Sequence, residues 1–197
     1  MPAVVESYPA HVPPEYRRKY TREDCRVLAA AGLLDLERYE LIDGELVSKT
    51  GKSRLHSNVL RLLAKWLVAM FGDDFVDKEV SVRLDSLNEP EPDAIVLNKP
   101  ALSIQTDNPT PADIRLLVEV SVSTREYDLG PKAARYAAAG IPEYWVLDIE
   151  QNRIVVHRAP APAGYQSIAA YSASEALSPL AAPGAVIRLT DLVPAAQ

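Results

Sequence analysis

The sequence contains few of the residues that indicate disulfide, zinc or membrane structure. One cysteine, Cys25, among 197 residues excludes an internal disulfide framework and a cysteine-rich zinc site. No apolar run reaches the roughly 20 residues that a membrane span needs, and residues 1–14 lack the apolar core of a signal peptide. We therefore expect a cytoplasmic protein that makes no membrane contact.

Positive charge is also scarce. The formal net charge of −6 argues against a dedicated nucleic-acid coat or scaffold, because such proteins are normally basic. It does not exclude an enzyme that acts on nucleic acid, since a bound divalent cation adds positive charge where acids cluster. The sequence has neither a Gly-rich phosphate loop nor a dinucleotide-binding fingerprint, which argues against the common nucleotide-binding folds.

The composition that remains is that of an ordinary globular protein. Hydrophobic residues make up 48% of the chain and charged residues 24%. Residues 1–20 are rich in proline and tyrosine and predict a loosely attached N-terminal arm. The length of the remainder, residues 21–197, predicts a single domain that can bury a sizeable core.

The order of the predicted elements indicates an α/β protein in which a mixed β-sheet is flanked by helices. Regular alternation of strands and helices, which would indicate a doubly wound parallel sheet, is missing. We expect helices at 21–32, 54–71 and 128–140, a hairpin at 39–47, and strands at 75–84, 92–96, 116–123, 143–148 and 153–157, with weaker strands at 165–171 and 186–189.

Two of the buried strands each contain one acid, Asp93 and Glu119. An acid in such a strand is costly to bury unless it is paired or holds a metal. If the sheet brings the two together, their oxygens suit a divalent cation; the other interpretation is that both acids meet structural partners. Side-chain alternation puts Glu119 and Ser121 on one face of their strand, opposite a face made of valines.

A single lysine follows these strands. Lys132 is the only lysine in residues 101–197, and it lies in the first turn of the helix predicted at 128–140. Asp128 suits the N-cap of that helix, Pro131 its first turn and Gly140 its end. From this position the Lys132 ammonium can reach back toward the carboxylates.

Three further polar residues are weaker candidates. His56 lies on a core-facing row of the helix at 54–71, where a histidine is more often a hydrogen-bonded structural residue than a ligand. Glu40 and Glu45 flank the Asp43-Gly44 dipeptide, which is a strong hairpin-turn signal. From spacing alone, both glutamates could simply face solvent on an edge hairpin.

Taken together, these motifs resemble a bacterial family of restriction-endonuclease-like proteins that is expanded in cyanobacteria, a branch of the PD-(D/E)XK nuclease superfamily. The resemblance covers roughly residues 20–150, and it is the order of the motifs that makes it specific. The motifs are residues 39–46, His56, Pro92-Asp93, Glu119-Val120-Ser121, Ser123-Thr124, Asp128, Lys132, Tyr136 and residues 140–146.

The resemblance implies a fold and a metal site. The fold is a mixed sheet flanked by helices. Asp93 and Glu119 would be the two acids that bind Mg²⁺ or Mn²⁺. The superfamily usually carries a lysine two residues after the second acid, where this chain has Ser121, and Lys132 fits the position to which this branch has moved its lysine.

The resemblance also implies supporting residues. The superfamily often adds an acid from an earlier element; Glu45 is our candidate for it, with Glu40 as the rival. His56 matches a recurrent family histidine near the site and is counted with the catalytic residues.

The implied activity is metal-dependent hydrolysis of DNA phosphodiester bonds by an endonuclease, with a homodimer expected because cleavage of both strands needs two sites. One alternative is a catalytically silent nucleic-acid-binding or regulatory module on a nuclease fold, which Ser121 and the negative charge would favour. Another is a nuclease that acts on RNA or on branched or damaged DNA, because a fold does not choose a substrate.

Overall fold

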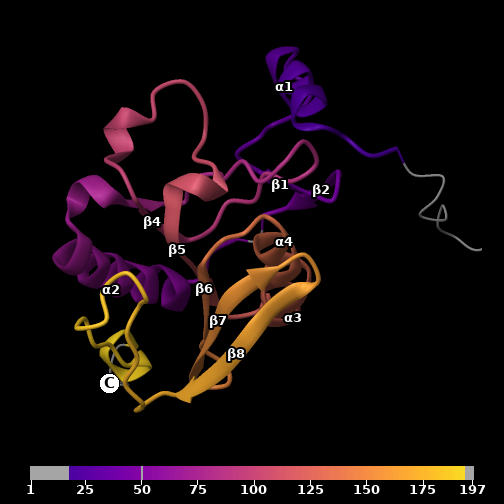
Figure 1. Ribbon diagram of the computed structural model, residues 1–197. Coiled ribbons are helices and arrows are strands. Elements are labelled where there is room, and N and C mark those ends of the chain that lie inside the picture. Colours follow the sequence, from indigo (N-terminus) through magenta and orange to yellow (C-terminus); the bar gives the residue numbers. More distant parts are fainter. Residues whose placement is uncertain (1–17, 50, 194–197) are drawn as a thin grey trace, which may run out of the picture.

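A six-stranded mixed sheet is the centre of the computed structural model, which describes residues 18–49 and 51–193 (Figure 1). The strand order is β3-β4-β5-β6-β7-β8. The β5–β6 pair is parallel and the other neighbours are antiparallel, so the predicted mixed sheet is confirmed. The strands are β3 (Val76–Lys78), β4 (Ala94–Leu97), β5 (Ile114–Ser121), β6 (Glu143–Asp148), β7 (Arg153–Ala161) and β8 (Gly164–Ser172).

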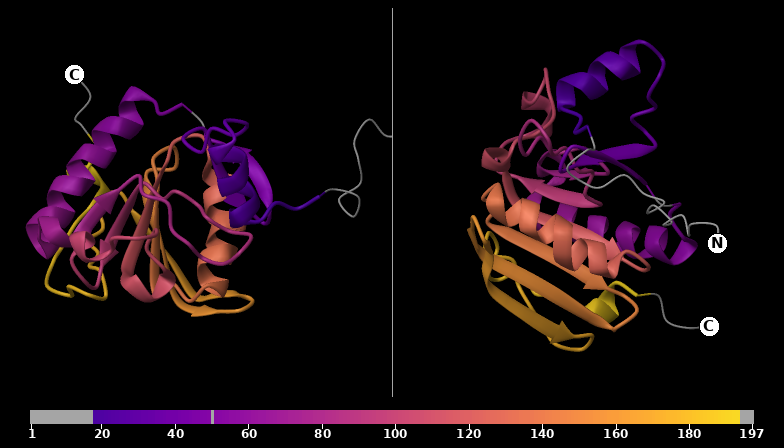
Figure 2. Two further views of the ribbon diagram at one scale, coloured as in Figure 1. Left: turned by 90° about the horizontal axis from the view of Figure 1, so that it is seen from above. Right: turned by 90° about the vertical axis from the view of Figure 1, so that its right-hand side faces the viewer.

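Helices cover both faces of this sheet (Figure 2). Helix α2 (Arg54–Phe71) packs on the face that carries Val118 and Val120. The opposite face, which carries Leu117, packs against α4 (Ala133–Ala138), and α3 (Arg125–Tyr127) leads into α4 through a π-turn at residues 128–132. The alternation predicted for β5 is therefore confirmed: the valines face one helix layer and Glu119 faces the other.

A small second sheet lies beside the first. Strands β1 (Tyr39–Ile42) and β2 (Glu45–Ser48) form the predicted hairpin. Asp43 and Gly44 adopt φ values of 53° and 73°, as the central residues of a type I′ turn require. The hairpin is tied to the chain before β4, because the Gly44 amide donates to the Leu87 carbonyl at 2.8 Å. Helix α1 (Arg22–Ala30) precedes it, and residues 1–17 of the expected arm lie outside the described residues.

Two predicted strands are far shorter in the structure, and the strand expected at 153–157 is longer, since β7 runs to Ala161. The strand expected at 75–84 ends at Lys78, because Glu79 has a φ of 56° that turns the chain out of the sheet. The strand expected at 186–189 is reduced to an isolated bridge between Leu177 and Ile187. Short 3₁₀ turns occupy Asp73–Phe75, Ala101–Ser103, Pro111–Asp113 and Leu189–Asp191.

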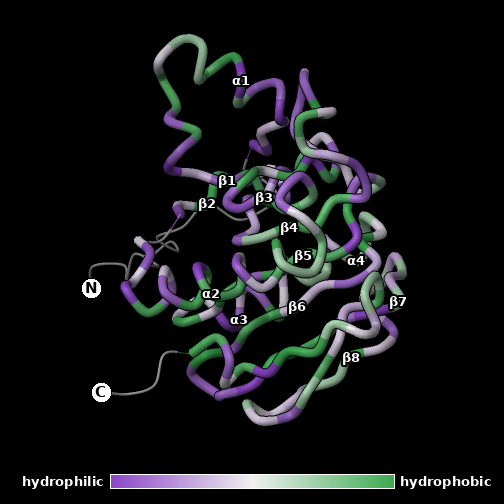
Figure 3. The backbone as a smooth tube through the Cα atoms, turned by 90° about the vertical axis from the view of Figure 1, so that its left-hand side faces the viewer, coloured by the Kyte–Doolittle hydropathy of each residue, from purple (hydrophilic) through white to green (hydrophobic). Residues whose placement is uncertain are grey.

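Hydropathy along the backbone agrees with a buried sheet between two layers of helices (Figure 3). Every residue of β4 and of β6 is buried, and α2 alternates between hydrophobic and hydrophilic residues, as a helix with one buried face does. Within the described residues, we find no helix that is both long and apolar enough to cross a membrane.

Candidate active site

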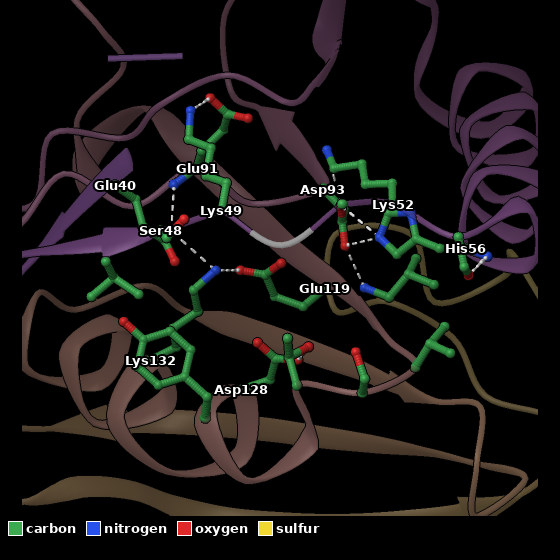
Figure 4. Close-up of a pocket in the computed structure, with 18 residues that line it drawn as sticks. Glu40, Ser48, Lys49, Lys52, His56, Glu91, Asp93, Glu119, Asp128 and Lys132 are labelled. Carbon is green, nitrogen blue, oxygen red and sulfur yellow. Dashed lines mark hydrogen bonds and ion pairs between the residues drawn. The ribbon is translucent and has the colours of Figure 1, made fainter. Parts of the chain in front are cut away.

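A cavity of about 370 Å³ opens where β4 begins and β5 ends (Figure 4). Because β4 and β5 are antiparallel and Ala94 pairs with Val118, the residue before Ala94 and the residue after Val118 lie at the same level. These residues are Asp93 and Glu119, and both line the cavity. The structure thus brings together the two acids that the sequence singled out, from opposite directions of the chain.

Asp93 is a buried carboxylate held by three partners. Its Oδ2 atom accepts the Val120 amide at 2.7 Å, and His56 Nε2 lies 3.0 Å from each carboxylate oxygen. The Lys52 ammonium lies 3.7 Å from Oδ1. Burial alone would raise the pKa of Asp93, but these hydrogen bonds and charges together lower it. Asp93 is therefore an ionised, oriented acceptor at neutral pH.

Glu119 differs from Asp93 in its proton affinity. Its Oε1 atom accepts hydrogen bonds from Lys132 Nζ at 2.9 Å and from the Tyr136 hydroxyl at 3.1 Å. Burial nevertheless raises the pKa of Glu119 to about 8, opposed by Lys132 and reinforced by the repulsion of the neighbouring acids, Asp93 among them. Both donors use Oε1, and Oε2 accepts no hydrogen bond from the part of the chain that the structure describes.

Lys132 reaches the carboxylates as expected, but from a π-turn rather than from the first turn of an α-helix. The helical segment begins before it, so Asp128 lies inside the turn and is not an N-cap. Pro131 lacks the N–H that a regular α-helix would use there, and π-turns of this kind are frequent at functional sites. The ammonium also lies 3.2 Å from Glu40 Oε2; burial opposes its charge, but Glu119 and Glu40 raise the pKa of Lys132 overall.

The structure places Glu40, and not Glu45, at the cavity. Glu40 is buried, lines the cavity and accepts the Glu91 amide at 3.2 Å. Glu45 is exposed and lies outside the cavity lining. The register explains the difference: Glu40 pairs with Val47 at the open end of the hairpin, whereas Glu45 adjoins the turn. Of the two candidates for the additional acid, the structure therefore brings the rival, Glu40, to the cavity and leaves our first choice, Glu45, outside its lining; the role of either acid in the reaction stays a prediction.

Ser121, which stands at the usual lysine position, is buried but does not line the cavity. Sequence reasoning missed Lys52 at the cavity, and it placed Asp128 among the family motifs and at a helix N-cap without predicting that it lines the cavity. Lys52 lies in the loop before α2 and contacts both Asp93 and Glu79. Asp128 accepts the Thr124 hydroxyl at 2.5 Å, and burial raises its pKa.

The donor set suits Mg²⁺ or Mn²⁺ in a site that is completed by other ligands. Five carboxylates line the cavity, and repulsion from three of them, Asp93, Asp128 and Glu40, contributes to the raised pKa of Glu119. Among the described residues, no three His, Cys, Asp or Glu side chains form a ready-made metal cage. Mg²⁺ is usually held by one or two carboxylates together with waters and substrate phosphates. Asp93 and Glu119, with the open Oε2 atom, fit such a site.

Comparison with known proteins identifies the family. A family model described as "Uma2: Putative restriction endonuclease" matches residues 28–190. The chain belongs to the Uma2 family. This membership confirms the resemblance seen in the motifs, and the family description supports a nuclease function in general terms. The comparison with curated proteins gives no match.

A solved structure shares the fold of this Uma2 protein. The crystal structure described as "a putative nuclease" from Anabaena variabilis superposes with a TM-score of 0.65 at 15% sequence identity. The match covers 83% of this chain and 94% of the other. At that identity the likeness shows the fold, and it confirms the restriction-endonuclease-like arrangement of a mixed sheet between helices.

Proposed function

We propose that this Uma2 protein is a metal-dependent endonuclease that hydrolyses DNA phosphodiester bonds. The observation that carries the proposal is the convergence of Asp93, Glu119 and Lys132 on one cavity. Two acids and a buried ammonium in one cavity are the groups that phosphodiester hydrolysis needs, because its transition state gathers negative charge that must be neutralised.

Asp93 and Glu119 would hold Mg²⁺ or Mn²⁺, which when bound orients an attacking water and neutralises charge on the phosphate. The protein prepares these ligands before any substrate arrives. His56 and the Val120 amide fix the Asp93 carboxylate, and Tyr136 fixes Glu119 through Oε1. The same hydrogen bonds also stabilise the two buried acids, since a buried charge without a partner is costly.

Lys132 supplies the fixed positive charge of the site. Its ammonium, bonded to Glu119 and close to Glu40, stays protonated through the reaction because its pKa is raised. We assign it the stabilisation of the pentavalent phosphate or of the attacking water, as a compact donor. In this proposal Lys132 takes over the task of the lysine that Ser121 replaces.

The same proposal includes a cytoplasmic homodimer acting on double-stranded DNA, since cleavage of both strands needs two sites. The catalytically silent module is the second candidate, and Ser121 at the usual lysine position is the observation that favours it. RNA and branched or damaged DNA are further substrates to be tried beside duplex DNA.

Nicking of supercoiled plasmid tests the proposal. We expect purified protein to nick plasmid with Mg²⁺ or Mn²⁺ and to stop when the metal is chelated. Asp93→Asn should lower the rate on the order of a hundredfold or more, the magnitude typical of an essential electrostatic group. Asp35→Asn, at an exposed acid outside the cavity, is the matched control and should keep full activity.

Each outcome of that assay has a distinct meaning. Equal nicking by the wild type and Asp93→Asn would identify a contaminating nuclease and leave the proposal without support. No nicking of plasmid, RNA or branched DNA by folded protein would favour the silent module. Loss of nicking in Asp93→Asn but not in Lys132→Met would keep the metal site and remove Lys132 from the reaction.

A further inference from the structure

A second cavity of about 500 Å³ runs along α2, beside the candidate active site. Its floor is apolar and is formed by Leu60, Ala64 and Val68. Its rim carries Arg61 and Lys65 on α2, with Lys78 on β3 among the other lining residues. We call this cavity, with its lining, the α2 groove.

Helical spacing explains the arrangement of the α2 groove. Arg61 and Lys65 are four residues apart, so their side chains lie one above the other on the same ridge of the helix. Ser57 occupies the preceding position of that ridge and also lines the groove. The distance from Ser57 to Lys65 is about 12 Å at 1.5 Å per residue. This length spans roughly three phosphates at about 3.4 Å of axial rise each along one DNA strand.

Within the described residues, the cations of the α2 groove have no acidic partner. Arg61, Lys65 and Lys78 are all exposed, and none makes an ion pair with any residue in the described ranges. Many other cations of this acidic chain are paired, so the groove concentrates unpaired positive charge. Two acids also line it: Glu79 is already paired with Lys52, and Asp73 lies in the 3₁₀ turn after α2.

The α2 groove adjoins the candidate active site. Lys52 lines the active-site cavity, and its ammonium contacts both Asp93 there and Glu79 in the groove. His56, the partner of Asp93, is the residue before Ser57 on the same helix. Figure 4 shows Lys52 and His56 together on the α2 side of Asp93. A chain that leaves the active site on this side therefore enters the groove.

We infer that the α2 groove binds the sugar-phosphate backbone of double-stranded DNA next to the bond that is cut, with Arg61, Lys65 and Lys78 contacting successive phosphates. This inference rests on the proposed nuclease function and adds the substrate-binding surface to it. Phosphate contacts of this kind position the duplex and carry no sequence preference. They release counterions, so their contribution to affinity falls as salt rises.

Fluorescence anisotropy with a labelled DNA duplex tests the inference. Binding is measured in Ca²⁺, which occupies oxygen-ligand sites, at several KCl concentrations. The variant Arg61→Gln/Lys65→Gln/Lys78→Gln should bind ten- to a hundredfold more weakly at about 0.1 M salt, and its log Kd against log salt slope should fall by about 2 to 3, near 0.9 per lost phosphate contact. In Mg²⁺ its KM for cleavage should rise while kcat is retained.

The matched control is Lys19→Gln/Arg38→Gln/Arg188→Gln, which removes the same charge from exposed cations outside both cavities. It should lose affinity by less than about threefold, the long-range effect of net charge alone. Equal losses of affinity and slope in the two triple variants would overturn the α2 groove while leaving the nuclease proposal intact.

Failure of the nuclease proposal gives a different result. If the wild type neither binds nor cuts the duplex, both proposals are overturned. If the wild type cuts and the groove variant cuts with an unchanged KM, only the groove is overturned. The three groove residues are exposed and unpaired, so a thermal unfolding midpoint close to that of the wild type is expected and excludes misfolding as the cause of weak binding.

Discussion

Asp93 and Glu119 are two buried acids whose pKa values shift in opposite directions. Asp93 accepts a hydrogen bond from the Val120 amide and lies within hydrogen-bond distance of His56, and its pKa is lowered. Glu119 accepts hydrogen bonds from Lys132 and Tyr136 on a single oxygen, Oε1. Burial among other acids nevertheless raises its pKa. The pair therefore combines one carboxylate that is charged at neutral pH with one whose charge a bound cation would favour. Neither pKa shift can be predicted from the sequence, because each depends on the hydrogen-bond partners and charges that the fold brings to the carboxylate.

The two hairpin glutamates give a sharp test at the residue scale. Glu40→Gln keeps the side-chain size but removes the charge that faces Lys132. We expect the nicking rate at saturating Mg²⁺ to fall about ten- to a hundredfold, the usual cost of losing a partner of a site residue. Glu45→Gln, at the exposed turn end of the same hairpin, should stay within about threefold of the wild type, the ordinary range for a surface substitution.

The reverse result, a large loss in Glu45→Gln and none in Glu40→Gln, would contradict this assignment and restore the original sequence-based choice. Initial rates with plasmid substrate, measured beside thermal unfolding of both variants, separate a loss of chemistry from a loss of fold.

At the scale of elements, the sequence was most informative where a local rule has a single outcome. Asp43-Gly44 predicts its turn because both residues must accept a positive φ. Asp93, just before β4, and Glu119 in β5 stood out because burial of an acid demands a partner. The π-turn at residues 128–132 could not be foreseen, since Pro131 fits the start of a regular helix equally well. The length of β3 depends on the positive φ of Glu79, which no residue type signals.

The β1–β2 turn provides a prediction for an element. Gly44 has a φ of 73°, and a Cβ atom there would lie 2.7 Å from Lys19 Cβ and 3.0 Å from the Tyr20 carbonyl. Gly44→Ala should therefore destabilise the protein by about 1 to 3 kcal/mol, because strain and overlap add. Urea denaturation measures the change.

Gly184→Ala is the control for that measurement, since a Cβ at Gly184 meets no atom within 4 Å. It should change the free energy of unfolding by less than about 0.5 kcal/mol. A Gly44→Ala protein as stable as Gly184→Ala would show that the hairpin can shift at no cost, and that its turn does not fix the position of Glu40.

At the scale of the whole molecule, the sheet buries a titratable histidine, His157, that makes the stability of the protein depend on pH. His157 on β7 is buried between the rings of Tyr144 and Tyr165, with centroids 5.2 and 5.5 Å away. Burial lowers the pKa of His157. Below about pH 6.5, His157 is therefore protonated in the unfolded chain but stays neutral in the folded chain.

Acidification from about pH 7.5 to 5.5 should consequently lower the free energy of unfolding through protonation of His157 in the unfolded state. The decrease should reach up to about 1.4 kcal/mol per pH unit within this range. His157→Phe keeps an aromatic ring in the cluster and should flatten this dependence. Glu119, with its raised pKa, acts in the opposite direction in both proteins, so the comparison isolates His157. Equal losses in the two proteins, measured by urea denaturation at both pH values, would contradict the burial of a neutral histidine.

The proposed nuclease function depends on one property of the molecule, that Asp93 and Glu119 together hold a divalent cation. Titration calorimetry with Mn²⁺ tests it without a substrate. We predict one binding site per chain in the wild type, and its loss, or a weakening of at least tenfold, in both Asp93→Asn and Glu119→Gln. The control Asp35→Asn, at an exposed acid outside both cavities, should bind as the wild type does. Wild-type binding that survives both substitutions, or no binding by folded wild-type protein, would contradict the proposal.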